Sequence, residues 1–285
     1  MFGGLGLEFC ARSRRKCITE AGIVQTKTLE RALIGLTTMR LTILGSGDAF
    51  CSGGRANACV RIDATRSCLV MEFGATSLQA WKKAGFSSNE IDAVVISHLH
   101  GDHFGGLPFL LLDCQFSAGR RRALRLYGPR GLRARLEMAM EAFFPGSSAI
   151  HWNFPWDVTE LYPGKVQSAA GFQISCLEVI HPSGAPALGL RIARGDKLLA
   201  FSGDSSWTPA LVEIAHQADL FLCECFSGGD IIVNHLNWDT IKDHLPQLRA
   251  RKIVLTHMND AAYALVDEMR AYGISRAEDG AVFEI

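Results

Sequence analysis

The stretch Ser97-His98-Leu99-His100-Gly101-Asp102-His103 decides how the fold of this chain is interpreted. It follows directly on the apolar run 93–96 (Ala-Val-Val-Ile), which has the length and composition of a short buried strand. Side chains alternate along an extended chain, so the first two histidines point to the same side. After the turn at Gly101, the aspartate and the third histidine return from another direction. One tetrahedral ion rarely takes so many ligands from so short a segment. The stretch therefore predicts two neighbouring metal ions.

The ligand types narrow the choice of metal. Imidazole and carboxylate together suit zinc, manganese or iron rather than calcium, which prefers all-oxygen surroundings. Histidine-rich sites accept several of these ions, and availability often decides between them. Zn²⁺ is the first choice here, with Mn²⁺ and Fe²⁺ as alternatives.

Composition excludes several classes of protein. The 285 residues carry a formal net charge of zero, so no overall field would attract nucleic acid or an anionic membrane. No apolar run reaches the roughly 18 residues of a membrane-spanning helix. The 9 cysteines are odd in number and scattered, unlike a secreted disulfide framework, which favours a reducing, cytoplasmic location. Cys223 and Cys225 are interpreted as small buried thiols on one strand face rather than as ligands.

Residues 1–38 differ from the rest of the chain. They begin Gly-rich, continue with the basic segment 12–16 and show no regular pattern. A secretory signal would place its basic residues before its apolar core, which is the reverse order. We interpret 1–38 as an N-terminal extension, either disordered or the result of a start site assigned too early, and 39–285 as the domain that contains the metal-binding residues.

From Met39 onwards strands and helices alternate in blocks. Predicted strands cover 41–44, 58–62, 68–72, 93–96, 124–127, 172–180, 188–193, 198–201, 220–224 and 252–255, and predicted helices cover 75–84, 106–116, 131–144, 209–216, 239–248 and 261–271. Helices occur in both halves. Two mixed β-sheets with helices on the outside, a fold of the α/β (α+β) class, is the simplest layering that buries all of these faces.

Four further predicted strands stop at a residue that can bind metal. These residues are His181, Asp204, Glu224 and His257. Taken singly, each is a common way to end a strand or to make a turn. Taken together, they follow the rule that sites of α/β proteins form at the carboxyl ends of strands.

With these residues in view, the chain resembles the metallo-β-lactamase-fold hydrolases from about Met39 to its C-terminus. The resemblance rests on His98-x-His100-x-Asp102-His103, His181, Ser202-Gly203-Asp204 and Thr256-His257, in the order of that family. It implies a four-layer αββα sandwich with a dinuclear site along one edge. The first ion would be held by His98, His100 and His181, and the second by Asp102, His103 and His257, with Asp204 bridging both. Two divalent ions about 3.5–4 Å apart need such a shared anionic ligand and leave room for a bridging hydroxide.

Within that superfamily the chain is most similar to the ribonuclease Z-like phosphodiesterases. The segment Leu44-Gly45-Ser46-Gly47-Asp48-Ala49 resembles their first-strand signature, whereas Arg55-Ala56-Asn57 has one residue more than their basic-polar loop. The resemblance implies that His235 protonates the departing alkoxide while Glu224 fixes its tautomer. It also makes Asp102 a catalytic residue as well as a ligand. The long arm with which ribonuclease Z clamps transfer RNA is absent between His181 and Asp204, so structured nucleic acid is not the expected substrate.

The sequence therefore predicts a metal-dependent hydrolase, a phosphodiesterase acting on a cyclic nucleotide or another small phosphodiester. One alternative is a hydrolase of carbon esters (a lactone, thioester or β-lactam) on the same metal site, and a less favoured one is a transfer-RNA 3′-end endonuclease. A redox protein is disfavoured, because the oxygen-reducing branch of the fold carries Glu where this chain has His100. A non-catalytic module would be expected to lack ligands, and none is missing.

Two surface features each allow two interpretations. The arginines at 120–122, 125, 130, 133 and 135 either attract a phosphorylated substrate or form a solvated helix face. The apolar segments 143–145 and 152–156 are expected to be exposed, as contacts of a homodimer or as a substrate lid. No membrane partner is expected.

Overall fold

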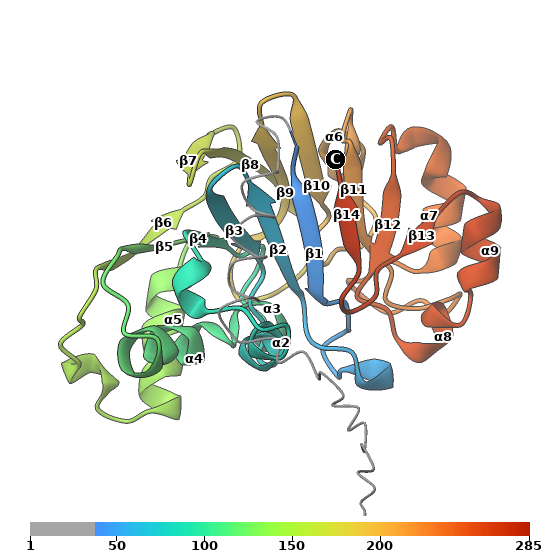
Figure 1. Ribbon diagram of the computed structural model, residues 1–285. Helices are drawn as coiled ribbons and strands as arrows, with labels where there is room; N and C mark the ends of the chain where they lie inside the picture. The colour runs from blue at the N-terminus through green and yellow to red at the C-terminus, as the bar shows by residue number, and fades with distance from the viewer. Residues whose placement is uncertain (1–37) are drawn as a thin grey trace, which may run out of the picture.

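The computed structural model describes residues 38–285 as two seven-stranded sheets packed face to face (Figure 1). In its spatial order the first sheet contains β14 (Val282–Glu284), β1 (Arg40–Gly45), β2 (Cys59–Ala64), β3 (Ser67–Met71), β4 (Ala93–Val95), β5 (Leu124–Gly128) and β6 (Trp156–Glu160). The second contains β13 (Ser275–Arg276), β12 (Ile253–Thr256), β11 (Leu220–Glu224), β10 (Lys197–Phe201), β9 (Ala187–Arg194), β8 (Phe172–Val179) and β7 (Gln167–Ala169). The α-helices are α2 (Ser77–Lys83), α3 (Gly101–Phe104), α4 (Leu107–Leu112), α5 (Leu132–Phe143), α6 (Ala210–Ala215), α7 (Trp238–His244), α8 (Asp260–Tyr263) and α9 (Val266–Ala271).

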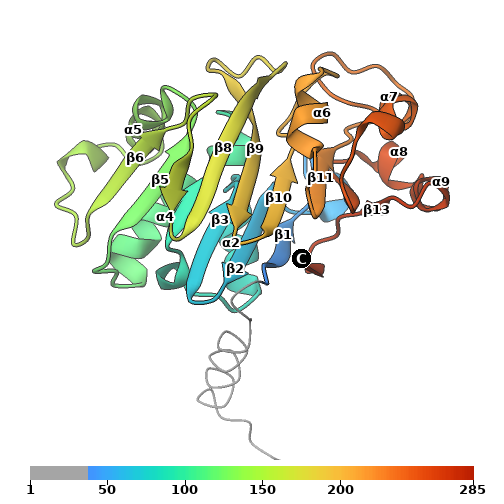
Figure 2. The same cartoon turned by 90° about the horizontal axis from the view of Figure 1, so that it is seen from above.

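Three hydrophobic clusters separate four layers. The central cluster lies between the two sheets, a second lies between the first sheet and helices α2, α4 and α5, and a third lies between the second sheet and helices α6, α7 and α9. Figure 1 shows α2, α4 and α5 on one side of the molecule and α7 to α9 on the other, and Figure 2 shows β8 to β10 lying over β1 to β3. The predicted four-layer αββα sandwich is confirmed.

The strands at the centre of each sheet are buried on both faces, because one face packs against the other sheet and the second face against helices. Their side chains alternate between the two faces. In β11, Leu220 and Leu222 face the central cluster, whereas Phe221 and Cys223 face the helices. Cys223 and Cys225 are both buried, as expected for small thiols. The seven described cysteines are all free thiols.

Each sheet is antiparallel at one end and parallel at the other. β3 to β6 run parallel in the first sheet, and β10 to β13 run parallel in the second. Parallel neighbours require crossover connections, and these contain the helices. The carboxyl ends of β4, β10, β11 and β12 therefore carry the loops in which ligands were predicted.

The structure differs from the predicted elements mainly at the sheet edges. Strands β6, β7, β13 and β14 were not predicted, and the predicted helix 106–116 is α4 followed by a π-helical turn at Asp113–Ser117. The segment 152–156 is only partly the exposed apolar loop that was expected: Asn153 and Pro155 are exposed, Trp152 and Trp156 are half-buried, and Phe154 is buried. Trp152 packs edge-on against Phe154 and Trp156, at 5.7 and 5.8 Å between ring centroids. Trp156 begins the edge strand β6, and Phe154, Trp152 and Trp156 belong to the hydrophobic cluster under the first sheet.

The expectation of an N-terminal extension at 1–38 falls almost wholly outside the described residues. Among the helices of 38–285, none combines the length and the apolar composition that crossing a membrane would require.

Candidate metal centre

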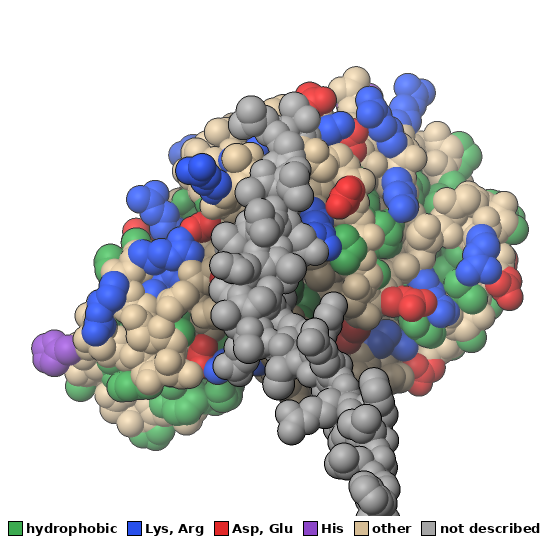
Figure 3. All heavy atoms as spheres, viewed as in Figure 1, with side chains coloured by type: hydrophobic (Ala, Val, Ile, Leu, Met, Phe, Trp, Pro, Cys, Tyr) green, Lys and Arg blue, Asp and Glu red, His purple; other side chains and the backbone are tan. Residues whose placement is uncertain are grey.

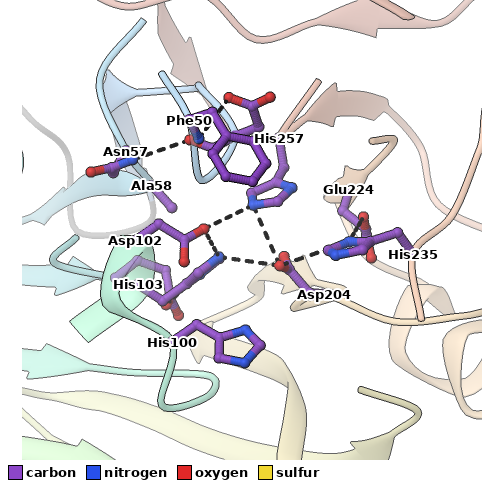
Figure 4. Close-up of polar contacts among 12 residues, drawn as sticks. Phe50, Asn57, Ala58, His100, Asp102, His103, Asp204, Glu224, His235 and His257 are labelled. Atoms are coloured by element: carbon purple, nitrogen blue, oxygen red, sulfur yellow. Dashed lines mark hydrogen bonds and ion pairs between the residues drawn. The ribbon is translucent and has the colours of Figure 1, made fainter. Parts of the chain in front are cut away.

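Seven predicted ligands from both halves of the chain meet at one edge of the sandwich. The ligand atoms of His98, His100 and His181 lie within 4.8 Å of one another, and so do those of Asp102, His103, Asp204 and His257. The Oδ2 atom of Asp204 also lies 3.7 Å from Nε2 of His98 and 3.9 Å from Nε2 of His181. Asp204 is thus in contact with both groups, as Figure 4 shows for the second of them.

Two glycines allow the ligand loops to approach this closely. A Cβ atom on Gly74 would come within 2.0 Å of the carbonyl oxygen of Asp102, so the helical turn α3 packs directly against the backbone there. Gly203 has a φ of 61°, a left-handed conformation that glycine adopts without strain, and it turns the chain immediately before Asp204. Both glycines therefore shape the loops that carry the ligands and not the hydrophobic core.

Hydrogen bonds outside the centre orient the imidazoles. The Nδ1 atom of His98 lies 2.9 Å from the hydroxyl of Ser97, and Nδ1 of His181 lies 2.9 Å from the carbonyl oxygen of Asn234. In each ring the other nitrogen, Nε2, faces the centre, since it lies within 4 Å of Asp204. Such outer partners commonly fix the tautomer of a metal-binding histidine.

Glu72 is a functional candidate that the sequence analysis missed. It is fully buried; its Oε2 lies 2.9 Å from Nδ1 of His103, and its Oε1 accepts a hydrogen bond of 2.7 Å from the backbone N–H of Ser97. Burial raises the pKa of Glu72, which the contacts with His103 and Ser97 partly offset. Its φ of 62° is unusual for a residue with a side chain, and such strain is typical of functional sites. Glu72 ends the predicted strand 68–72, so the strand-end signal that indicated the other ligands also applied to it.

The electrostatics of the centre favour a cation. Burial alone would raise the pKa of Asp204, but the imidazoles of His257, His103 and His98 hold it well below its usual range. Burial alone would lower the pKa of His103 and of His257, but the carboxylate of Asp204 raises both. The carboxylates therefore attract positive charge into a buried site, as a proton or as a metal ion.

Unpartnered atoms show that the residues fit a metal. Within 38–285, Nε2 of His98 and Oδ1 of Asp204 are buried and have no hydrogen-bond partner. Leaving a buried polar atom unpaired costs about 1–3 kcal/mol. A divalent ion would provide the missing partner, and the mixed imidazole and carboxylate set matches zinc-type ions.

The predicted pair His235 and Glu224 lies beside these ligands. The Nδ1 atom of His235 is 3.0 Å from Oε2 of Glu224, whose Oε1 accepts a hydrogen bond from the backbone of Ser205 (Figure 4). Burial and the neighbouring Asp204 raise the pKa of Glu224 well above its usual range, whereas burial lowers the pKa of His235. The His235 ring stacks on His257, with centroids 5.6 Å apart. The contact with Glu224 leaves Nε2 of His235 free to act on another group.

Of the predicted arginine cluster, Arg120 is buried, whereas Arg121, Arg125, Arg130 and Arg135 are exposed. Arg120 is 1% exposed and donates hydrogen bonds to four backbone carbonyls. Arg122 pairs with Asp92, and Arg133 pairs with Asp157. Arg120 therefore neither attracts a substrate nor forms part of a solvated helix face, and both expectations are wrong for this residue. Its side chain stabilises loops from inside the protein. Figure 3 shows lysine and arginine spread over the visible face, with acidic side chains among them.

Known proteins resemble the chain in sequence and in fold. A ribonuclease Z of Bacillus velezensis is 24% identical over 279 residues, which cover 78% of this chain and 88% of that protein. The zinc phosphodiesterase ELAC protein 1 of Mus musculus is 33% identical over 129 residues, 44% of this chain and 34% of that protein. The metallo-beta-lactamase fold protein YhfI of Bacillus subtilis has a TM-score of 0.71 at 21% identity and covers 87% of this chain and 100% of its own. A diphosphatase of the PhnP family has a TM-score of 0.68 at 20% identity, over 87% and 98% of the two chains.

These similarities agree with the predicted family. The structural neighbours establish the metallo-β-lactamase fold, and the sequence relatives support a ribonuclease Z-like hydrolase. The family model described as Anti-Pycsar protein Apyc1 matches residues 39–279, which is most of the chain. The protein is therefore a hydrolase of the metallo-β-lactamase fold and belongs to the Anti-Pycsar protein Apyc1 family.

Proposed function

We propose that the protein is a metal-dependent phosphodiesterase that uses two divalent ions, preferably zinc, to hydrolyse a cyclic nucleotide or a similarly small phosphodiester. The observation that carries the proposal is the contact of Asp204 with both histidine groups, at 3.7 Å from His98 and 3.4 Å from His257. A buried carboxylate shared by two groups of ligands is what a pair of cations requires.

Each residue then has a role. One ion would be held by His98, His100 and His181, the other by Asp102, His103 and His257, and Asp204 would bridge them. When bound, the ions would supply Lewis-acid polarisation of the phosphoryl oxygens and a lower pKa for bound water. The carboxylate of Asp102 is less enclosed than that of Asp204, with 9% against 2% of the side chain exposed. Asp102 is therefore the better placed of the two to accept a proton from an attacking water.

His235 would protonate the leaving oxygen through its Nε2 atom. Its Nδ1–H would donate to Glu224, which would hold the ring in one orientation. The donor would be the imidazolium, and loss of its Nε2 proton would leave the neutral ring with its hydrogen on Nδ1. An alkoxide is a poor leaving group, and proton donation by a positioned histidine typically contributes about 10²–10⁴-fold to such a step. This relay favours phosphodiesters over carbon esters, whose leaving groups need less assistance.

Two features support a small substrate. Between His181 and Asp204 the chain forms the hairpin of β9 and β10 rather than a long arm. Arg120, the first arginine of the basic run 120–122, donates to backbone carbonyls inside the protein and is not available to a polyanion. A substrate with a single phosphodiester matches these features better than a folded RNA.

The test is a substrate panel on the purified full chain, with the metal content determined by mass spectrometry. The panel holds 3′,5′-cyclic nucleotides, bis(p-nitrophenyl) phosphate, a lactone and a transfer-RNA precursor. We expect two ions per chain and turnover of the cyclic nucleotides, lost in the metal-stripped protein and restored by zinc or manganese. Turnover of the lactone without any phosphodiester, or cleavage of the transfer-RNA precursor alone, would refute the proposal.

A further inference from the structure

Phe50 is a large aromatic side chain left exposed at the edge of the metal centre. It is 80% exposed and lies in the loop between β1 and β2. That loop borders the second ligand group: the backbone N–H of His257 donates to the carbonyl of Ser46 at 3.0 Å, and Gly47 pairs with Met258. Figure 4 draws Phe50 in one view with His257 and Asp102.

The loop holds Phe50 in one place. The buried carboxylate of Asp48 accepts hydrogen bonds from the backbone N–H of Phe50 at 3.2 Å and of Ser52 at 2.8 Å. Asn57 donates to the carbonyl of Asp48 at 3.1 Å. An aromatic ring on a fixed backbone can bind a ligand at low entropic cost, because little of its mobility remains to be lost.

A second apolar group lies in the loop that carries Asn234. Ile231 is 86% exposed and Val233 is 77% exposed, directly before Asn234, whose carbonyl binds His181. A single exposed apolar side chain would need no explanation. Here, however, each apolar group belongs to a loop that contacts a metal-ligand candidate: the Phe50 loop contacts His257, and the loop of Ile231 and Val233 contacts His181.

The basic residue of the Phe50 loop is not free to bind further phosphates. Arg55 donates to the carbonyl of Met258 at 2.8 Å, and its guanidinium lies 4.0 Å from the centroid of the Tyr263 ring. The loop therefore offers an aromatic face rather than a charge. That chemistry matches a ligand with one phosphodiester and a flat ring.

We infer that Phe50, together with the segment Ile231–Val233, holds the base of a nucleotide substrate by stacking and apolar contact while its phosphodiester lies at the metal centre. The inference rests on the proposed function and makes Phe50 a residue that determines specificity. Since every base has a ring face, this mode of binding selects nucleotides over base-free phosphodiesters and tolerates different bases.

The test compares a cyclic nucleotide with methyl riboside 3′,5′-cyclic phosphate, which has the same phosphodiester and no base. The metal-loaded full chain is compared with Phe50→Ala, Phe50→Trp and Phe116→Ala. Phe116 is a matched control, because it is 71% exposed in the turn that follows α4, outside the metal centre. We expect Phe50→Ala to lower the ratio of kcat/KM for the nucleotide to that for the base-free compound about five-fold or more, mainly through KM. Phe50→Trp restores the ratio, and Phe116→Ala leaves it unchanged.

The outcomes separate the two proposals. If the wild-type protein hydrolyses both compounds and Phe50→Ala changes both equally or neither, the role of Phe50 is refuted while the phosphodiesterase stands. If the metal-loaded wild-type protein hydrolyses neither compound, the proposed function fails and this inference fails with it. A wild-type preference for the base-free compound would refute base binding alone.

Discussion

The Nδ1 atom of His181 lies 2.9 Å from the backbone carbonyl oxygen of Asn234. A carbonyl can only accept, so Nδ1 carries the hydrogen and Nε2 is left unprotonated, 2.9 Å from Nδ1 of His100. The next residue in the chain is His235. One loop therefore fixes the tautomer of a proposed ligand and presents the proposed proton donor, and Asn234 adopts a left-handed conformation with a φ of 68° to achieve both.

A substitution at Asn234 should disturb both functions together. Valine in a left-handed conformation costs roughly 1–2 kcal/mol, so Asn234→Val should shift the loop and with it the carbonyl that binds His181. We expect lower zinc content and lower kcat in the same variant. Asn234→Gly, which tolerates this φ, serves as the control and should retain both. Two ions bound with wild-type affinity in Asn234→Val would show that the contact with His181 does not position the ligand.

The proposed role of His235 as a proton donor can be tested by changing the leaving group of the substrate. His235→Gln should lower kcat about 10²–10⁴-fold for a cyclic nucleotide, whose alkoxide must be protonated as it leaves. The effect should be much smaller for bis(p-nitrophenyl) phosphate, because p-nitrophenolate leaves without a proton. Glu224→Gln should act in the same direction.

The metal content of His235→Gln distinguishes a proton donor from a metal ligand. The ligand atoms of His181, Asp204 and His235 also lie within 4.8 Å of one another, so His235 has the geometry of a ligand as well. If His235→Gln retains two ions, the residue is a proton donor. Loss of one ion would contradict the relay.

Much of the fold follows from local patterns in the sequence. The strands β1 to β5 and β8 to β12 were predicted to within a few residues, because they are apolar and end at turn residues. The edge strands β6 and β7 escaped prediction, since one face of an edge strand is polar and the strands are short. The sequence QSA of β7, for example, has no strand signature of its own.

The residues that surround the ligands were harder to predict than the ligands. His, Asp and Glu at strand ends have a recognisable signature, and the structure brings together all nine residues predicted for the centre. The partner of His181 is a backbone carbonyl, which any residue at position 234 could supply, so the sequence contains no signal for it. Arg120 shows the converse: a basic run suggested a charged surface, yet folding buries its first guanidinium among carbonyls.

Removal of the ions should destabilise the protein as well as inactivate it. An ion present at 1,000 times its dissociation constant stabilises the folded state by about 4 kcal/mol. For a domain of this size the loss corresponds to a fall in Tm of roughly 10 °C. Calorimetry with and without a chelator measures it. Asp204→Asn, which removes the shared charge, should have a Tm that no longer responds to zinc; an unchanged response would exclude Asp204 as a ligand.

Glu72 should tune metal affinity without binding metal. It contacts Nδ1 of His103 from outside the centre. Loss of such a partner typically raises the Kd for the metal by about 10–100-fold. Glu72→Gln keeps the size of the side chain but removes its charge. Competition with a chromogenic chelator measures the affinity, and circular dichroism checks that the variant is folded. A folded variant with wild-type affinity would make Glu72 a purely structural residue.

The buried thiols predict how stability depends on alkaline pH. Burial raises the pKa of Cys59 from an ordinary value near 9.0 to about 12. The folded state therefore holds the proton more tightly than the unfolded state, and the resulting stability is fully present below pH 9 and is lost as the pH rises towards 12. For this one group the free energy of unfolding should fall by about 1.4 kcal/mol per pH unit in that window. Urea titrations at pH 8 and pH 10 measure the fall, and Cys59→Ala, although less stable at both values, should show a smaller one. Lysine and tyrosine also titrate at alkaline pH, so only the difference between the two proteins isolates the contribution of Cys59. Equal falls in the two proteins would mean that the Cys59 thiol does not contribute to the loss of stability.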